Sequence, residues 1–185
     1  IESDKSAPLK PLPQRGRLIA LAIGIDRFPS IAGQEKAQLP DLEYAAKDAG
    51  AFLDAMRKSS AGLFREVKAV LLSDDTEAKP DQAQIRQALD VLREAGPDDT
   101  VVLFLASHGF SDAAGNYFFM TRDGKLDDVL AVSRIPNASG RAPSLIEGTE
   151  LFDALRSTAG RRFLIVDTCH ARQIKGPLDT HSLRK

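Results

Sequence analysis

Four short apolar segments recur along the chain, and each has the length of a β-strand. They lie at residues 17–25, 66–73, 100–107 and 162–167. A near-continuous run of apolar and β-branched residues is typical of a strand that is buried on both faces of a parallel sheet. We therefore expect these four segments to form the central sheet of the protein.

The segments between these strands show a helical period instead. Apolar residues recur there at the i, i+3, i+4 spacing of an amphipathic helix. They are Leu42, Ala45, Ala46, Ala49, Phe52, Leu53 and Met56, then Ile85, Ala88, Leu89 and Leu92, and finally Leu151, Phe152 and Leu155. Pro80 can open the second helix, and Gly96 and Gly160 can end the second and third. The alternation of strands and helices predicts an α/β fold, with a mainly parallel sheet between helices on both faces.

One stretch, residues 110–147, departs from this alternation. It contains two apolar pieces, YFFMT at 117–121 and VLAVS at 129–133, which flank Asp123-Gly124. A turn dipeptide between two such pieces is typical of a hairpin. We expect a small hairpin and loop insertion outside the main sheet.

Composition is consistent with one globular domain. The chain has 185 residues, of which 43% are hydrophobic, enough to bury a core. We assign this domain to residues 17–172. The proline-containing residues 1–16 predict an extended N-terminal arm, and the polar residues 173–185 predict a C-terminal tail.

Charge and cysteine content indicate which partners and which cellular compartment to expect. The formal net charge is −1, which provides no attraction for nucleic acid or for a membrane surface. No apolar run approaches the roughly 18 residues that span a bilayer. The single cysteine cannot form an internal disulfide, so we expect a reducing, cytoplasmic location.

Chemically active residues follow two of the predicted strands. His108 comes directly after the third strand, and Cys169 follows the fourth within FLIVDTCHAR at 163–172. Side chains at the carboxyl ends of adjacent parallel strands meet at one edge of the sheet. An imidazole there can take the proton of the thiol and make it a nucleophile. The backbone N–H of Gly109, together with that of Cys169, can form an oxyanion hole.

Other interpretations of these residues exist. A lone cysteine is often a small buried apolar residue, and a histidine after a strand is often a hydrogen-bonded loop residue. A zinc site needs more ligands than Cys169 and His170 supply, so we expect no metal. The chain lacks both G-x-G-x-x-G and a P-loop, which disfavours a nucleotide-binding α/β protein.

The same motifs carry a family resemblance. VVLFLASHGF and FLIVDTCHAR, together with RLIALAIGI and LPDLEYAAKDAGAFLDAM, resemble the large subunit of caspase-like cysteine peptidases, in particular the bacterial and metacaspase-type branch. The resemblance implies a three-layer α/β sandwich and peptide-bond hydrolysis through a thioester. Cys169 would be the nucleophile, His108 the general acid/base, and Gly109 a contributor to the oxyanion hole.

The resemblance also implies a substrate preference. Where animal caspases usually have glutamine two residues before the nucleophile, this chain has Asp167. In metacaspase-type enzymes acids at this position and at that of Asp48 line a pocket for arginine or lysine, and Ser107 would contribute to its wall. A pair of carboxylates attracts a cationic side chain. Alternatively, Asp48 faces solvent from its helix and Asp167 bonds to backbone at the strand end.

Partners and cofactors are expected from the same resemblance. A caspase-type sheet has more strands than the four found here, so we expect a separate small subunit from the same precursor to complete it. The final residues HSLRK fit cleavage after a basic residue, by the protein itself or by an upstream activating protease. Protein substrates are expected, and a catalytically idle scaffold is the alternative.

Calcium binds to some members of that family, but the acid pairs of this chain do not support a calcium site. The pairs are Asp74-Asp75, Asp98-Asp99 and Asp127-Asp128. None has the ligand spacing of an ion-binding loop. We therefore expect no cofactor and assign these pairs to solvated loops.

Overall fold

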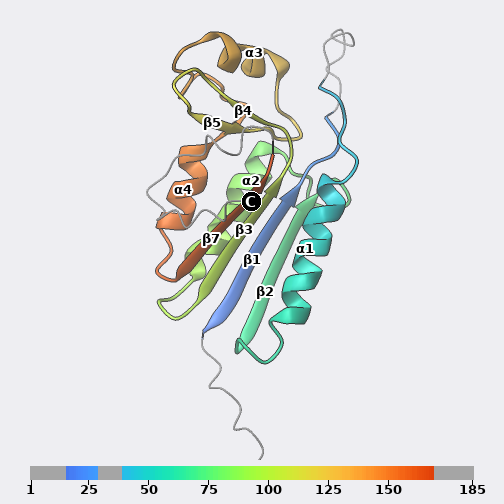
Figure 1. Cartoon of the computed structure of the whole chain (residues 1–185), viewed down its shortest axis with the longest axis vertical. Helices are drawn as coiled ribbons and strands as arrows, with labels where there is room; N and C mark the ends of the chain where they lie inside the picture. The colour runs from blue at the N-terminus through green and yellow to red at the C-terminus, as the bar shows by residue number, and fades with distance from the viewer. Residues whose placement is uncertain (1–15, 29–38, 169–185) are drawn as a thin grey trace, which may run out of the picture.

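The central sheet of the computed structural model contains the four predicted strands. They are β1 (Arg17–Gly24), β2 (Glu66–Ser73), β3 (Thr100–Ala106) and β7 (Arg161–Asp167), in the order β2-β1-β3-β7. Every neighbouring pair is parallel, as predicted (Figure 1).

The structure describes residues 16–28 and 39–168. The predicted arm and tail, and with them Cys169 and His170, lie outside the described residues.

Strand β1 shows why these segments form a buried sheet. Its residues 18–23 are all 0% exposed, and their side chains alternate between two apolar clusters. Ala20 and Ala22 belong to the cluster beneath helix α1 (Ala45–Ser59). At Gly24 a Cβ atom would lie 2.2 Å from the carbonyl oxygen of Ala45. Any side chain at position 24 of β1 would collide with the main chain at the start of α1, so glycine is required there.

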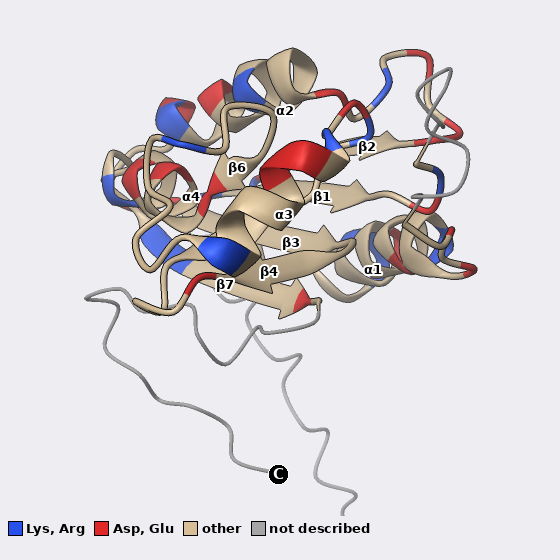
Figure 2. Ribbon diagram, turned by 90° about the horizontal axis from the view of Figure 1, so that it is seen from above, with Lys and Arg blue, Asp and Glu red and all other residues tan. Residues whose placement is uncertain are grey.

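Helices cover both faces of the sheet, which confirms the predicted three-layer arrangement. Helix α1 packs on one face, against β1, β2 and β3. The opposite face is covered by α2 (Gln82–Leu89), the 3-10 turn η1 (Asp90–Glu94) and α4 (Gly148–Arg156). Figure 2 shows the sheet from above, with α1 on one side and α2 on the other.

A second, smaller sheet lies at the carboxyl ends of the central strands (Figure 1). It contains β4 (Gly109–Ser111), β5 (Tyr117–Phe119) and β6 (Ile146–Glu147), paired antiparallel with β5 in the middle. The predicted small hairpin outside the main sheet exists, but its strands are β4 and β5.

The prediction of a strand at 129–133 is wrong, because these residues lie in helix α3 (Leu126–Arg134). Val129 and Val132 are buried while Leu130 is 37% exposed, which is a helical spacing rather than a strand alternation. Asp127 and Asp128 occupy the first turn, where carboxylates interact favourably with the helix dipole. In so short a run the two periods cannot be separated by apolar content alone.

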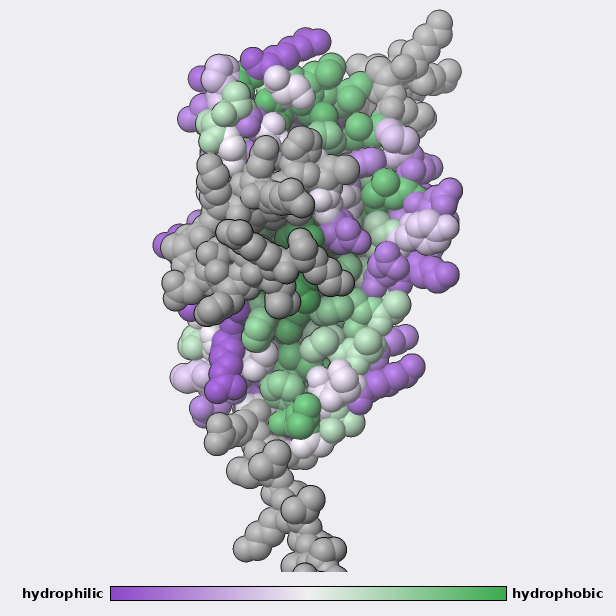
Figure 3. All heavy atoms as spheres, in the orientation of Figure 1, coloured by the Kyte–Doolittle hydropathy of each residue, from purple (hydrophilic) through white to green (hydrophobic). Residues whose placement is uncertain are grey.

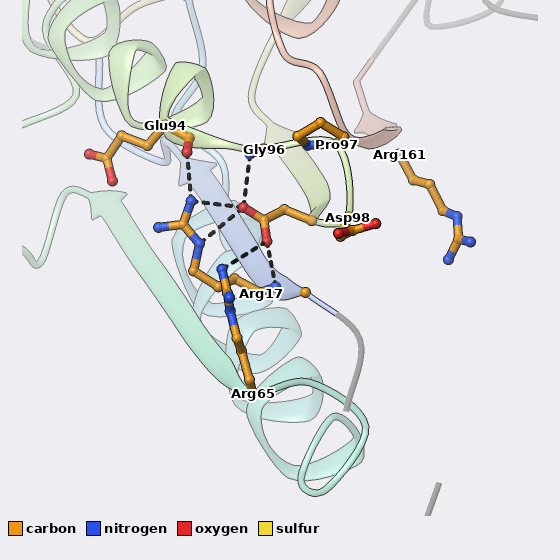
Figure 4. Close-up of a pocket in the computed structure, with 9 residues that line it drawn as sticks. Arg17, Arg65, Glu94, Gly96, Pro97, Asp98 and Arg161 are labelled. Atoms are coloured by element: carbon orange, nitrogen blue, oxygen red, sulfur yellow. Dashed lines mark hydrogen bonds and ion pairs between the residues drawn. The ribbon is translucent and has the colours of Figure 1, made fainter. Parts of the chain in front are cut away.

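The assignment of the acid pairs to solvated loops is also wrong, since Asp127-Asp128 lies in α3 and each of the other two pairs has one buried member. Asp74 is 6% exposed and Asp99 is 2% exposed. Asp99 accepts hydrogen bonds from Arg17 at its backbone N–H, Nε and Nη2, at 2.6, 3.0 and 2.7 Å, and from the N–H of Gly96 at 2.9 Å. Figure 4 shows Arg17 and Arg65 directed toward this carboxylate at the amino ends of the strands.

This environment changes the acidity of Asp99. The hydrogen bond from Arg17 is the largest cause that lowers the pKa of Asp99 from 3.8 to about 2, against the opposing effect of burial. Because the folded pKa lies below the ordinary value, the ionised carboxylate stabilises the fold at neutral pH. This stabilisation disappears as the pH falls from about 4 through about 2.

We predict that Asp99→Asn lowers the free energy of unfolding by about 2 kcal/mol at pH 7, because Arg17 loses a charged acceptor. Urea unfolding followed by circular dichroism measures the change. The matched control is Asp98→Asn at the exposed neighbouring position, which should stay within about 0.5 kcal/mol of wild type. Between pH 4 and pH 2 the wild type should lose more stability than Asp99→Asn; equal losses would contradict the assignment.

Candidate active site

The register between β3 and β7 brings the two predicted catalytic positions to one edge. Ala106 at the end of β3 lies opposite Asp167 at the end of β7. His108 is two residues beyond the first and Cys169 two residues beyond the second. Neighbouring strands are about 4.8 Å apart. The predicted adjacency of the third and fourth strands is thus confirmed, while the position of Cys169 itself lies outside the described residues.

The ring of His108 is held by a hydrogen bond and by an aromatic contact. Its Nε2 lies 2.8 Å from the carbonyl oxygen of Pro40. A carbonyl only accepts, so Nε2 carries the proton and donates it, and a neutral ring then has Nδ1 as its basic nitrogen. The ring of Phe28 packs against the imidazole with the two centroids 4.8 Å apart.

Two aspartates hold the loops that carry these contacts. Asp74, at the end of β2, accepts hydrogen bonds from the N–H groups of Asp26 at 2.6 Å and Arg27 at 3.2 Å. Asp41 accepts from the N–H of Phe28 at 3.1 Å. The segment after β1 is therefore bonded to Asp74 at residues 26 and 27 and to Asp41 at residue 28. These bonds hold Phe28 beside His108.

Asp26 connects the same loop to helix α1. Its carboxylate accepts hydrogen bonds from the N–H groups of Ala45 at 2.7 Å and Ala46 at 3.3 Å. Burial raises the pKa of Asp26, and these two hydrogen bonds partly oppose the rise. The helix begins at Ala45, three residues later than the apolar pattern beginning at Leu42, because Asp26 satisfies its first N–H groups.

Gly109 is buried at the start of β4, directly after His108. It pairs with Phe119, and in the preceding pair the N–H of Met120 donates to the carbonyl of His108 at 3.0 Å. Hydrogen-bonded and non-hydrogen-bonded pairs alternate in an antiparallel ladder, so the N–H of Gly109 is directed away from β5. A contact between this N–H and an oxyanion stays a prediction.

Ser107 is buried, whereas a residue in the wall of a substrate pocket has to be accessible to the substrate. It is 3% exposed, and its hydroxyl donates to the carbonyl of Met120 at 3.1 Å. This bond supports the main chain beside His108. A contact between Ser107 and substrate stays a prediction.

The two predicted pocket acids lie on the same side of the sheet. Asp48 is exposed in the first turn of α1. Asp167 is exposed at the end of β7, where Leu164 and Val166 pack against the cluster under α2 and α4. Since side chains alternate along a strand, Asp167 points to the other face, which is the face of α1. The arrangement is compatible with one acidic pocket between α1 and β7.

The roles of Pro40, Phe28 and Asp74 were not predicted from the sequence. The sequence could have indicated Asp74, because this residue directly follows a strand and so lies at the same edge of the sheet as His108. The role of Pro40 depends on a carbonyl group, which every residue has, and no sequence pattern marks it.

Metal and membrane sites find no support in the part of the chain that the structure describes. No group of three or more histidine, cysteine, aspartate or glutamate side chains there could hold a metal ion. None of the helices among these residues is long and apolar enough to cross a bilayer.

Comparison with known proteins identifies the family. The family model of the caspase domain matches residues 17–184. The chain belongs to the caspase-domain family. This is a family of cysteine peptidases, so the match supports hydrolase chemistry of the cysteine-peptidase kind in general. No curated protein sequence matches the chain at a significant level.

A solved structure shows the same fold. Protein GSU0716 from Geobacter sulfurreducens superposes on this caspase domain with a TM-score of 0.57 at 15% sequence identity, over 83% of this chain. The match covers 50% of the Geobacter protein, so the chain spans about half the length of that structural relative. At this identity the likeness concerns the fold alone.

We predict that Asp74→Ala destabilises the caspase domain by about 2 kcal/mol, because the N–H groups of Asp26 and Arg27 lose their acceptor. Chemical denaturation measures the free energy of unfolding. Asp75→Ala is the matched control, since Asp75 is the exposed neighbour with a side chain 75% accessible. A loss of equal size in both variants would show that Asp74 does not organise this loop.

Proposed function

We propose that this chain carries the catalytic residues of a cysteine endopeptidase that cleaves after arginine or lysine. The observation that carries the proposal is the register that pairs Ala106 with Asp167. It sets His108 and Cys169 at equal offsets beyond two adjacent strand ends. An imidazole and a thiol at neighbouring strand ends are the pair that nucleophilic catalysis requires.

The hydrogen bond from His108 to Pro40 supports a direction for proton transfer. With Nε2 donating to the carbonyl, Nδ1 takes the proton of the Cys169 thiol. The thiolate attacks the peptide carbonyl, and the N–H of Gly109 stabilises the oxyanion. The imidazolium then protonates the leaving amine, and a thioester remains. Water, deprotonated by His108, hydrolyses the thioester and restores the thiol.

The basic specificity is supported by the placement of two exposed carboxylates. Asp48 on α1 and Asp167 on β7 face the same side of the sheet, close to the edge that carries His108. An arginine or lysine side chain entering between them would neutralise both charges, and a guanidinium can bind a carboxylate bidentately. An acidic side chain would be repelled.

A small subunit from the same precursor is the partner that we propose, with proteins as substrates. Among the described strands β7 is at the edge of the central sheet. On the face of α1 it exposes Phe163 by 53% and Ile165 by 41%, and Figure 3 shows apolar side chains gathered on this face. A further subunit covering β7 would remove this apolar surface from water. We propose a cytoplasmic enzyme that needs no cofactor; calcium dependence is tested by adding chelator to the assay below.

We predict that peptides with arginine or lysine before the scissile bond are hydrolysed faster than a matched aspartate peptide. Cys169→Ala should abolish turnover, because no other thiol exists in the chain. His108→Ala should lower kcat by about 10²–10⁴-fold, the usual effect of losing a general base. The assay uses the chain as purified and again with the proposed small subunit supplied. Turnover by Cys169→Ala equal to wild type would refute the nucleophile, and a fully inactive but folded wild type would favour a scaffold role.

We predict that Asp167→Asn lowers kcat/KM for the arginine peptide by roughly 10–100-fold, because a cationic side chain loses its charged partner. Asp48→Asn should act in the same direction. The controls are Asp153→Asn on α4 and Asp54→Asn further along α1, whose side chains are 72% and 64% exposed. Unchanged discrimination between the arginine and aspartate peptides in both pocket variants would remove the acidic-pocket assignment.

A further inference from the structure

The short strand β5 contacts both loops that carry the catalytic dyad, His108 and Cys169. At its carboxyl end, Met120 donates its N–H to the carbonyl of His108 and accepts the hydroxyl of Ser107, at 3.0 and 3.1 Å. At its amino end, the Tyr117 hydroxyl lies 2.7 Å from Oγ1 of Thr168. Thr168 is the residue directly before Cys169.

Strand β5 is a firm support for these contacts. Tyr117, Phe118 and Phe119 are 4%, 0% and 0% exposed. The strand pairs with β4 on one side and with β6 on the other. Consequently neither end of β5 can shift without disturbing the apolar core, which is close-packed.

The side chain of Tyr117 is also fixed at its base by helix α4. A Cβ atom added at Gly148, the first residue of α4, would lie 3.3 Å from both Cβ and the carbonyl oxygen of Tyr117. The helix start thus packs tightly on this tyrosine. Its ring extends from a fixed point toward the end of β7, where the hydroxyl meets Thr168.

A phenylalanine would fill the same buried space, as it does at the next two positions of the strand. Burying a hydroxyl costs free energy unless it forms a hydrogen bond. The bond to Thr168 gives the buried hydroxyl of Tyr117 a partner, and it ties the end of β7 to the small sheet.

We propose that Tyr117 is a positioning residue for catalysis. Through Thr168 it holds the end of β7, from which Cys169 follows in the sequence, while Met120, directly after the same strand, holds the main chain of His108. Three residue steps of extended chain, about 10 Å, separate Tyr117 from Met120. In this proposal β5 holds the ends of β3 and β7, the two strands that the dyad residues follow, in a set relation to each other. The inference rests on the proposed function, because it assigns Tyr117 a role in that reaction.

The test removes the hydroxyl alone. In Tyr117→Phe we expect kcat to fall roughly 10-fold, since a small misplacement of a reacting group is costly, while KM for the arginine peptide stays within about two-fold. Cys169 is the only cysteine, so the rate of its alkylation by iodoacetamide can be followed across pH in the chain alone. The pH profile of alkylation should shift in Tyr117→Phe relative to wild type.

Thr168 variants separate positioning from general stability. Thr168→Val should reproduce the effect of Tyr117→Phe, the double variant should be no worse than either single variant, and Thr168→Ser should retain wild-type kinetics. Thr158→Val is the matched control, because the Thr158 hydroxyl also forms a hydrogen bond, to the Leu155 carbonyl at 2.8 Å, and this bond lies at the end of α4. It should lower stability without changing kcat or alkylation.

The outcomes are distinguishable. Wild-type kcat and alkylation in Tyr117→Phe, or additive effects in the double variant, would overturn the positioning role. If Tyr117→Phe does not fold, Thr168→Val and Thr168→Ser decide the matter by the same measurements. Turnover retained by Cys169→Ala overturns the proposed function; turnover lost there but unchanged in Tyr117→Phe overturns the positioning role only.

Discussion

The parallel pairing of β3 with β7 is the constraint on which the rest of the site depends. It places Ala106 opposite Asp167, and every candidate catalytic position is counted from that pair. A slip by one residue would turn the side chains of β7 to the opposite face of the sheet. Leu164 and Val166 would then leave the core cluster that they pack against, while Asp167 would leave the face of α1. The burial of apolar side chains therefore determines which residues meet at the candidate site as well as the stability of the sheet.

Buried carboxylates hold the ends of the strands in this arrangement. At the amino ends, Asp99 binds the side chain and main chain of Arg17 and so joins β1 to β3. At the carboxyl ends, Asp74 and Asp26 bind main-chain N–H groups of the loop after β1 and of α1. Each acid accepts main-chain N–H groups at a place where regular backbone pairing is missing: the start of β1, the start of α1 or the loop after β1. A buried N–H without an acceptor costs about 1–3 kcal/mol. These contacts allow an irregular loop to hold Phe28 beside His108.

The small antiparallel sheet adds a second level of organisation at the same edge. Strand β4 begins directly after His108, and its partner β5 reaches both His108 and Thr168. The central sheet sets the ends of β3 and β7 side by side, and the small sheet holds the main chain at His108 and the side chain of Thr168. The candidate site therefore lies at a part of the fold that both sheets support.

Much of this architecture follows from the sequence alone, because it depends on local periodicity. The four strands, the three helices between them and the order in which they alternate are visible as runs and spacings of apolar residues. Burial on both faces holds for β1 and β3 but not for β2 and β7. The same patterns singled out His108 and Cys169, since each follows a strand, while Asp167 was singled out by the family resemblance. Periodicity failed at 129–133, where a five-residue run fits a strand and a helix equally well, and packing of Val129 and Val132 against the core decided for the helix. Only the tertiary structure could assign the contacts of His108 with Pro40 and Phe28, the burial of Asp74 and Asp99, and the bond between Tyr117 and Thr168. These interactions join residues far apart in the chain, and they depend on a carbonyl, a ring face or a hydroxyl whose partner only the folded chain brings within reach.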